Sequence, residues 1–146
     1  MASDEKLNKI YKNSKTIAII GLSSDSRKPS FQVAEYLQQQ DFRIIPINPK
    51  YSRVLNEKCY PDLISAQYDL APRRIDIVDI FRRPEFVSSH VDEAIKIGAQ
   101  VIWMQEGIEN VEAAARAKAK GLTVIMNSCL MKAHRRLNQV SNQQYA

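Results

Sequence analysis

The chain has 146 residues, 45% of them hydrophobic and 25% charged, which are ordinary proportions for a soluble globular protein with one core. Its net charge of +5 favours a phosphate-bearing partner, either nucleic acid or a nucleotide cofactor. Because no apolar run could span a bilayer and the acidic start is unlike a signal peptide, we expect a cytoplasmic protein that does not bind membranes. Two cysteines and two histidines are too few to predict a disulfide scaffold or a zinc site.

Hydrophobic spacing predicts alternating helices and strands along the chain. The stretch "SDEKLNKIYKN" (3–13) predicts an N-terminal helix, because Leu7, Ile10 and Tyr11 fall on one face. The β-branched run "TIAII" (16–20) is typical of a buried parallel strand. The other expected strands are 42–48, 75–80, 100–104 and 122–126, and the other expected helices are 30–40, 62–67, 84–97, 110–120 and 128–140.

Strands that alternate with helices indicate an α/β fold: a doubly wound sheet of five parallel strands with helices on both faces, in a single domain. We expect residues 1–14 to form a helix that packs on the domain, residues 15–140 to form the domain, and residues 141–146 to form a flexible tail. Ligands of such sheets bind at the carboxyl ends of the strands, where the strand order reverses. The loops that follow the strands are therefore the candidate site.

The first of these loops is typical of an anion-binding turn. It reads "GLSSDSRKPS" (21–30), in which the glycine permits close backbone approach and the proline and serine open a helix with free N–H groups. Two cations at a helix N-terminus oppose the helix dipole unless an anion compensates them. The alternative is an ordinary first turn whose serines cap the helix. The candidate phosphate-binding residues here are Gly21, Ser23, Arg27, Lys28, Pro29 and Ser30.

The second loop lacks the carboxylate that an NAD-binding domain places after its second strand to bind the ribose. Asn48, Pro49 and Lys50 stand there instead, with Arg53 close behind. A cation in place of a carboxylate predicts a ligand with an extra phosphate near its ribose, and both NADP and coenzyme A would satisfy that. The alternative is a surface turn with solvated cations.

Two further loops contribute candidates. Arg82 and Arg83 in "FRRP" lie just past the third expected strand, and one of them could simply be a surface residue. In "QEGIEN", Gly107 gives room beside the point where the strand order reverses. We interpret Glu106 as an acidic residue favoured near a helix N-terminus, in preference to a general base.

Taken together, "GLSSDSRKPS", "PINPK", "DIFRRPE", "WMQEGIEN" and "CLMKAHRRL" resemble the small stand-alone CoA-binding proteins of bacteria and archaea. These are similar to the N-terminal CoA-binding domain of the succinyl-CoA synthetase alpha subunit. The resemblance covers about residues 15–137 and implies a Rossmann-like domain whose cofactor is coenzyme A, with the diphosphate at the first turn. It further implies that Asn48, Pro49 and Lys50 border the 3′-phosphate, that Phe81, Arg82, Arg83 and Val87 border the adenine or the phosphates, and that Gln105 and Gly107 line the pantetheine path.

The chain departs from that synthetase because it has no second domain with a phosphorylated histidine. His90 and His134 are better interpreted as packing or surface residues, and no catalytic triad, carboxylate pair or metal cluster is visible. We therefore expect a protein that binds CoA or acyl-CoA without chemistry of its own, as a carrier, sensor or regulatory protein.

Other functions remain open at this point. They are an NADP-binding module or small oxidoreductase, an enzyme that acts on acyl-CoA, and the CoA-binding subunit of a split acyl-CoA ligase. Nucleic-acid binding rests on net charge alone and is not expected, because no basic stripe with interleaved aromatic residues supports it. A protein partner or a homodimer stays undecided.

Cys129 supports one further hypothesis. It follows the fifth expected strand and so lies at the ligand edge, where its thiol could form a mixed disulfide with CoA. The competing interpretation is a small buried residue that starts a helix.

Overall fold

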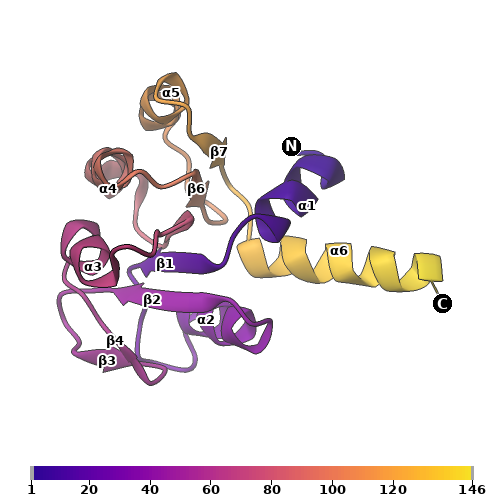
Figure 1. Cartoon of the computed structure of the whole chain (residues 1–146), viewed down its shortest axis with the longest axis horizontal. Coiled ribbons are helices and arrows are strands. Elements are labelled where there is room, and N and C mark those ends of the chain that lie inside the picture. The colour runs from indigo at the N-terminus through magenta and orange to yellow at the C-terminus, as the bar shows by residue number, and fades with distance from the viewer. Residues whose placement is uncertain (1, 146) are drawn as a thin grey trace.

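A five-stranded parallel sheet forms the centre of the structure, a computed structural model that describes residues 2–145 (Figure 1). The strands occur in the spatial order β2-β1-β5-β6-β7, and every neighbouring pair is parallel. This confirms the predicted doubly wound fold. The strands are β1 (Thr16–Ile20), β2 (Arg43–Ile47), β5 (Ile77–Ile80), β6 (Val101–Met104) and β7 (Thr123–Ile125).

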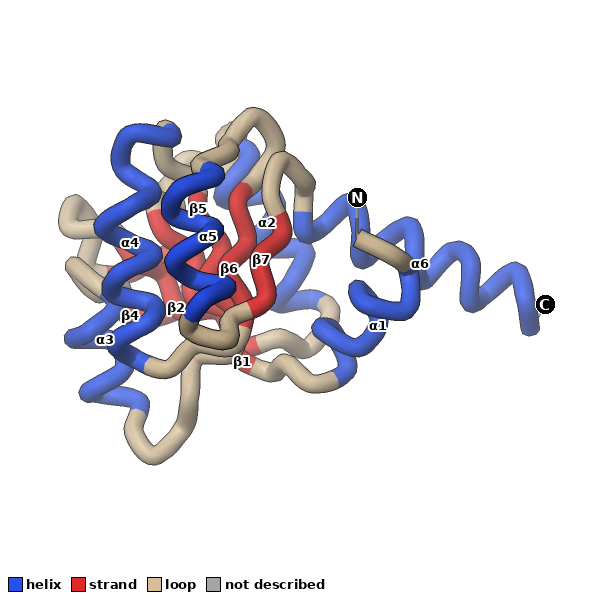
Figure 2. Tube along the Cα trace, turned by 90° about the horizontal axis from the view of Figure 1, so that it is seen from above, coloured by secondary structure: helices blue, strands red, loops and turns tan. Residues whose placement is uncertain are grey.

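Helices cover both faces of the sheet because successive side chains of a strand point to opposite faces. Ala18 and Ile20 of β1 belong to one buried cluster and Ile17 and Ile19 to the other. Figure 2 shows the two helical layers from above. The first cluster packs under α3 (Leu63–Leu70), α4 (Pro84–Ile97) and α5 (Val111–Ala119). The second packs under α1 (Asp4–Lys12), α2 (Pro29–Gln39) and α6 (Leu130–Tyr145).

The segment between β2 and α3 contains a small hairpin that the sequence analysis treated as loop. Its strands are β3 (Arg53–Val54) and β4 (Glu57–Lys58), joined through Leu55 and Asn56 with φ of 53° and 63°. Two consecutive residues with positive φ are typical of the two-residue turns that close hairpins. Leu55 is a poor residue for such a turn, which is why the pattern gave no signal.

The last helix extends further than expected. α6 runs through Tyr145 and so includes most of the segment 141–146 for which a flexible tail is predicted, while residue 146 lies outside the described residues. Figures 1 and 2 show α6 projecting beyond the sheet, with α1 beside its first turns. Among the described helices, none has the length and apolar character needed to cross a bilayer.

The strand order reverses between β1 and β5, because β2 lies on one side of β1 and all later strands lie on the other. This is the place where open α/β sheets bind ligands. The loops that follow β1 and β5 touch here: a Cβ on Gly21 would meet the backbone oxygen of Phe81 at 2.4 Å.

Candidate ligand-binding site

A cavity of about 660 Å³ opens at the carboxyl ends of the strands. Its lining comes from the start of α2, the loop after β5, the loop after β6 and the start of α6. The sequence-predicted residues that it brings together are Pro29, Phe81, Arg82, Arg83, Gln105 and Gly107. It also includes residues that had not been assigned to a ligand, among them Glu106, Met131 and Lys132.

Two of the helices that begin at this cavity, α2 and α4, lack the side-chain N-terminal caps that other helices have. Within residues 2–145, α2 begins after Lys28 and α4 after Arg83, and neither residue makes a side-chain cap hydrogen bond. Cys129 precedes α6, so a thiol stands there in place of a cap oxygen. By contrast, the caps of α1, α3 and α5 accept through side-chain oxygens of Ser3, Asp62 and Asn110.

Uncapped helix starts leave N–H donors and the positive end of the helix dipole available to an anion. Cations take the cap positions of α2 and α4, and no acidic residue lies in the first turn of α2 or α6. Glu85 in the first turn of α4 pairs with Arg83 at 3.4 Å. The cavity is therefore an electropositive site, suited to a ligand with several negative charges.

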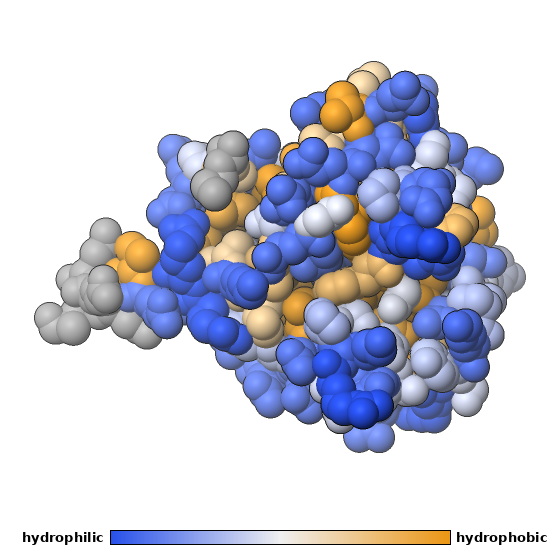
Figure 3. All heavy atoms as spheres, turned by 180° about the vertical axis from the view of Figure 1, so that it is seen from behind, coloured by the Kyte–Doolittle hydropathy of each residue, from blue (hydrophilic) through white to orange (hydrophobic). Residues whose placement is uncertain are grey.

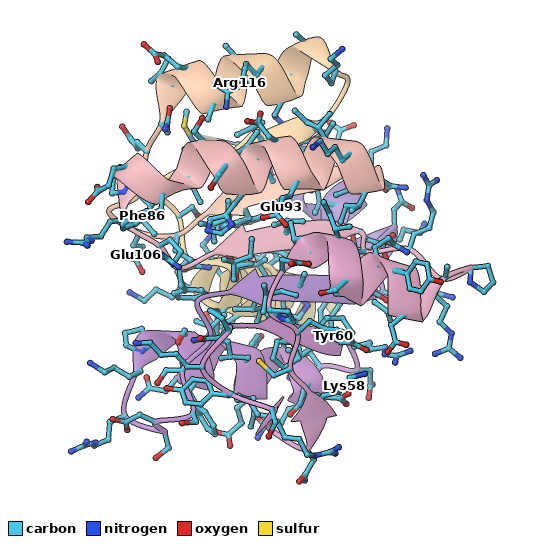
Figure 4. The ribbon with its side chains drawn as sticks, turned by 90° about the vertical axis from the view of Figure 1, so that its left-hand side faces the viewer. Lys58, Tyr60, Phe86, Glu93, Glu106 and Arg116 are labelled. Carbon is cyan, nitrogen blue, oxygen red and sulfur yellow. The ribbon has the colours of Figure 1, made fainter. Side chains whose placement is uncertain are left out.

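Phe86 holds the two arginines of the loop after β5. The guanidinium carbons of Arg82 and Arg83 lie 4.5 and 5.3 Å from the centre of its ring, within range of a cation–π contact. Figure 4 shows Phe86 and Glu106 at one end of the molecule, away from Lys58 and Tyr60 on the side of β3 and β4. Sequence reasoning missed Phe86, although its place three residues after an arginine pair on a helix start was a usable signal.

The loop after β1 is braced by its own side chains. The backbone N–H of Ser23 donates to Ser30 Oγ at 3.0 Å, and Ser30 is buried at the start of α2. Arg27 is 88% exposed and forms an ion pair with Asp25 at 3.0 Å. The structure thus places the Ser30 hydroxyl inside the loop and the Arg27 guanidinium outside it.

The loop after β2 is joined to the first loop. Asn48 Nδ2 donates to the backbone oxygen of Leu22 at 3.1 Å, and its Oδ1 accepts from the backbone N–H of Lys50 at 2.9 Å. Pro49 and Lys50 are exposed beside this link. Val87, which the family resemblance implicates, has no exposed surface and packs in the core between α4 and the sheet.

A buried carboxylate lies next to the cavity. Asp79 is on β5, opposite Ile19 and Trp103 in the sheet register, and is completely buried. Its two oxygens accept from Nε2 of Gln105 at 2.8 and 3.0 Å. Burial raises the pKa of Asp79 to about 8, against the opposing effect of the Gln105 hydrogen bond. From the sequence, this residue is predicted to lie in a strand and has no assigned role.

Cys129 lies where two cavities meet. A second cavity of about 630 Å³ runs between α1, β7 and α6, and it shares Glu106, Cys129 and Lys132 with the first. Glu106 and Lys132 form an ion pair at 2.9 Å. Figure 3 shows apolar surface crossing the centre of the rear face between hydrophilic groups.

The thiol of Cys129 is expected to react slowly at neutral pH. Burial raises its pKa, and the carboxylates of Asp79 and Glu106 raise it further, although two backbone N–H groups oppose this. In a Cys59→Ala background, the rate of iodoacetamide labelling should be low at pH 7 and rise steadily up to and beyond pH 9. A rate that reaches its plateau below pH 8 would contradict this assignment. The hypothesised mixed disulfide needs the thiolate, whose population this environment lowers.

The two histidines have packing roles. The ring of His134 meets Tyr11, Tyr36 and Phe42 edge-on at 4.9–5.7 Å between centroids, and its Nδ1 is 2.8 Å from the Tyr36 hydroxyl. Burial lowers the pKa of His134. His90 lies beside Glu93, at 3.5 Å. Within the described residues, no group of His, Cys, Asp and Glu is arranged to hold a metal ion.

A scan against protein families matches residues 15–135 to the CoA binding domain. The chain belongs to this CoA-binding domain family. The match includes every strand of the main sheet and the whole lining of the first cavity. The family resemblance noted from the sequence motifs is therefore confirmed.

Proteins of similar sequence or structure support this family assignment. The uncharacterized protein YneT of Bacillus subtilis is 36% identical over 132 residues, which cover 90% of this chain and 94% of YneT. A hypothetical protein from Pyrococcus horikoshii has a solved structure that matches with a TM-score of 0.86 and 36% identity, covering 93% of this chain and 92% of that one. An ADP-forming acetate–CoA ligase II of Archaeoglobus fulgidus is 30% identical over 119 residues, but these are 75% of this chain and 17% of the ligase.

Proposed function

We propose that the protein binds coenzyme A or acyl-CoA at the carboxyl edge of its sheet, as a carrier, sensor or regulatory protein without chemistry of its own. The observation that carries this proposal is the contrast in helix caps. Lys28 and Arg83 precede α2 and α4 without making a side-chain cap hydrogen bond, whereas α1, α3 and α5 are capped by side-chain oxygens. A ligand with a diphosphate and a further phosphate supplies the missing acceptors.

The proposal assigns parts of the ligand to parts of the edge. The diphosphate is bound near the starts of α2 and α4, with Arg82 and Arg83 as cations. The 3′-phosphate lies near Lys50, beside the link between the first two loops. The pantetheine chain passes Gln105 and Gly107 toward the junction of the two cavities. This order follows the edge of the sheet from β2 to β7.

A panel of ligands tests the proposal by thermal shift. Binding to the folded state alone stabilises it by about 2.7 kcal/mol at a ligand concentration a hundred times Kd. For a domain of this size that is a rise in Tm of roughly 5–10 °C. We expect this rise with CoA and acetyl-CoA, a smaller one with dephospho-CoA, and none with ATP or NADP. A rise with NADP and none with CoA would replace the proposal with the NADP-binding alternative.

Two arginine variants test whether the cavity, and not the net charge of the protein, binds CoA. Arg82→Ala removes a cation from the cavity, and Arg73→Ala removes one from an exposed position before β5, at the opposite edge of the sheet. The first variant should reduce the CoA-induced shift, and the second should leave it unchanged. Equal effects would mean that net charge, and not the cavity, determines binding.

A second function is favoured by the match to the ligase. The chain corresponds to 17% of that enzyme, so it could serve as the CoA-binding subunit of a split acyl-CoA ligase. Native mass spectrometry of the protein purified from its source distinguishes the two. A subunit of a split ligase should be recovered with a second chain, and a carrier or sensor with its ligand alone.

A further inference from the structure

The pair formed by Asp79 and Gln105 has a geometry that packing alone does not require. Every other residue of β5 is apolar, and Asp79 occupies a position between Ile19 and Trp103 where an aliphatic side chain would fit the core. A buried carboxylate loses its hydration and needs compensating hydrogen bonds. The structure supplies them from one group, the amide of Gln105.

While Asp79 is ionised it can only accept, so the two hydrogen bonds fix which way the Gln105 amide faces. Both use Nε2, so Oε1 is turned away from the carboxylate. No hydrogen bond to Oε1 is found in the described part of the chain, and in that part the sole buried side-chain polar atom without a partner is Nδ1 of His90. Oε1 therefore keeps some contact with solvent. Gln105 is 4% exposed and lines the cavity, so that contact is with the cavity.

We propose that Asp79 is a positioning residue that presents Gln105 Oε1 to the cavity as a hydrogen-bond acceptor, which selects ligands that carry an N–H donor at this point. The two amide N–H groups of a pantetheine chain are such donors, and a bare nucleotide has none there. This inference rests on the proposed CoA binding. It adds the chemistry that distinguishes CoA from other nucleotides with the same phosphates.

The fixed orientation of the Gln105 amide makes the site selective for ligands with an N–H donor. A freely rotating glutamine offers either a donor or an acceptor, so it would accept a ligand carbonyl as readily as an N–H. With Nε2 held by Asp79, a ligand carbonyl at this point meets Oε1 and is left without a donor. Leaving a buried polar group unpaired is costly, and this discriminates against such ligands.

Two ligands that differ only beyond the diphosphate test the inference. These are CoA and adenosine 3′-phosphate 5′-diphosphate, which share the nucleotide but not the pantetheine chain. Isothermal titration calorimetry is performed at pH 9, where Asp79 is ionised, with the wild type, Asp79→Ala, Gln105→Leu and the double variant. Ile77→Ala is the control for loss of volume on the same strand and the same face as Asp79, because Ile77 lies in the same buried cluster as Ile19 and Trp103.

Both single variants should weaken CoA binding about five- to tenfold, the effect of one hydrogen bond in a buried site, and leave the affinity for the nucleotide within twofold. The double variant should lose no more than Gln105→Leu alone, because the two residues act through one contact. Ile77→Ala should leave the ratio of the two affinities unchanged.

Other results overturn the inference. Equal losses for both ligands would mean that Asp79 only supports the fold, and an unchanged ratio in Gln105→Leu would mean that Oε1 does not contact the ligand. If the wild type binds CoA and the variants give either of these results, only this inference fails. If the wild type binds neither compound, the proposed function fails and the inference fails with it.

Discussion

Replacing Asp79 with asparagine is expected to raise the melting temperature at pH 9 by many degrees and to change it little at pH 4. Burial raises the pKa of Asp79 from 3.8 to about 8, so the folded state prefers the protonated acid. The stability that this preference provides is complete below pH 3.8 and is lost as the pH rises through about 8. Asparagine is neutral at every pH and keeps an oxygen that can accept from Gln105 Nε2, so the variant avoids this loss. Each unit of pKa shift is worth about 1.4 kcal/mol, so the effect amounts to several kcal/mol.

Thermal melts of the wild type and the variant between pH 4 and pH 9 measure this difference. Asp76→Asn is the matched control, since Asp76 precedes the same strand but its Oδ2 accepts from the backbone N–H groups of Lys15 and Thr16 at 2.8 and 3.0 Å. That variant should be less stable than the wild type and should show no gain confined to alkaline pH. Parallel curves for Asp79→Asn and the wild type would show that Asp79 titrates as an ordinary exposed carboxyl.

Gly21→Ala is expected to be the most damaging of the glycine substitutions. Gly21 has φ of +84°, and a Cβ there would lie 2.4 Å from the backbone oxygen of Phe81 and 3.2 Å from its carbonyl carbon. The positive φ alone costs about 1–2 kcal/mol for an alanine. The clash adds to this, because the contact is with backbone that cannot rotate away. The two loops at the strand reversal should separate, so CoA binding should be lost as well.

Gly121→Ala separates the cost of the positive φ from the cost of the steric clash. Gly121 has φ of +87°, but a Cβ there would meet nothing within 4 Å. This variant should lose about 1–2 kcal/mol in urea unfolding and bind CoA as the wild type does. If Gly21→Ala loses no more stability than Gly121→Ala, the clash with the loop after β5 does not contribute to the loss of stability.

Much of the fold could be predicted because local pattern and packing agree. The continuous apolar run at 16–20 became β1, and the helix predicted at 84–97 became α4 with the same bounds. Prolines and glycines marked several boundaries: Pro84 begins α4 and Gly98 ends it in a left-handed conformation. Pro46 is tolerated within β2 because that strand is at the edge of the sheet.

The composition of the cavity could be predicted only in part, because it depends on helix phase and on distances across the sheet. In α4 the buried residues Val87, Val91 and Ala94 form one face, which places Phe86 outside it, against the arginines. The partnership of Asp79 with Gln105 joins positions on neighbouring strands, and no local pattern reveals such a contact. A carboxylate inside an apolar run was nevertheless a signal that could have been used.

The cations at the starts of α2 and α4 favour ligand binding but lower the stability of the unliganded protein. An aspartate at position 28 or 83 would cap its helix and stabilise the empty protein by about 1 kcal/mol. It would also occupy the place of the anion and repel it. Engineering for thermostability at these two positions should therefore yield proteins that are more stable and bind less ligand. The unliganded wild type is thus less stable than this fold allows.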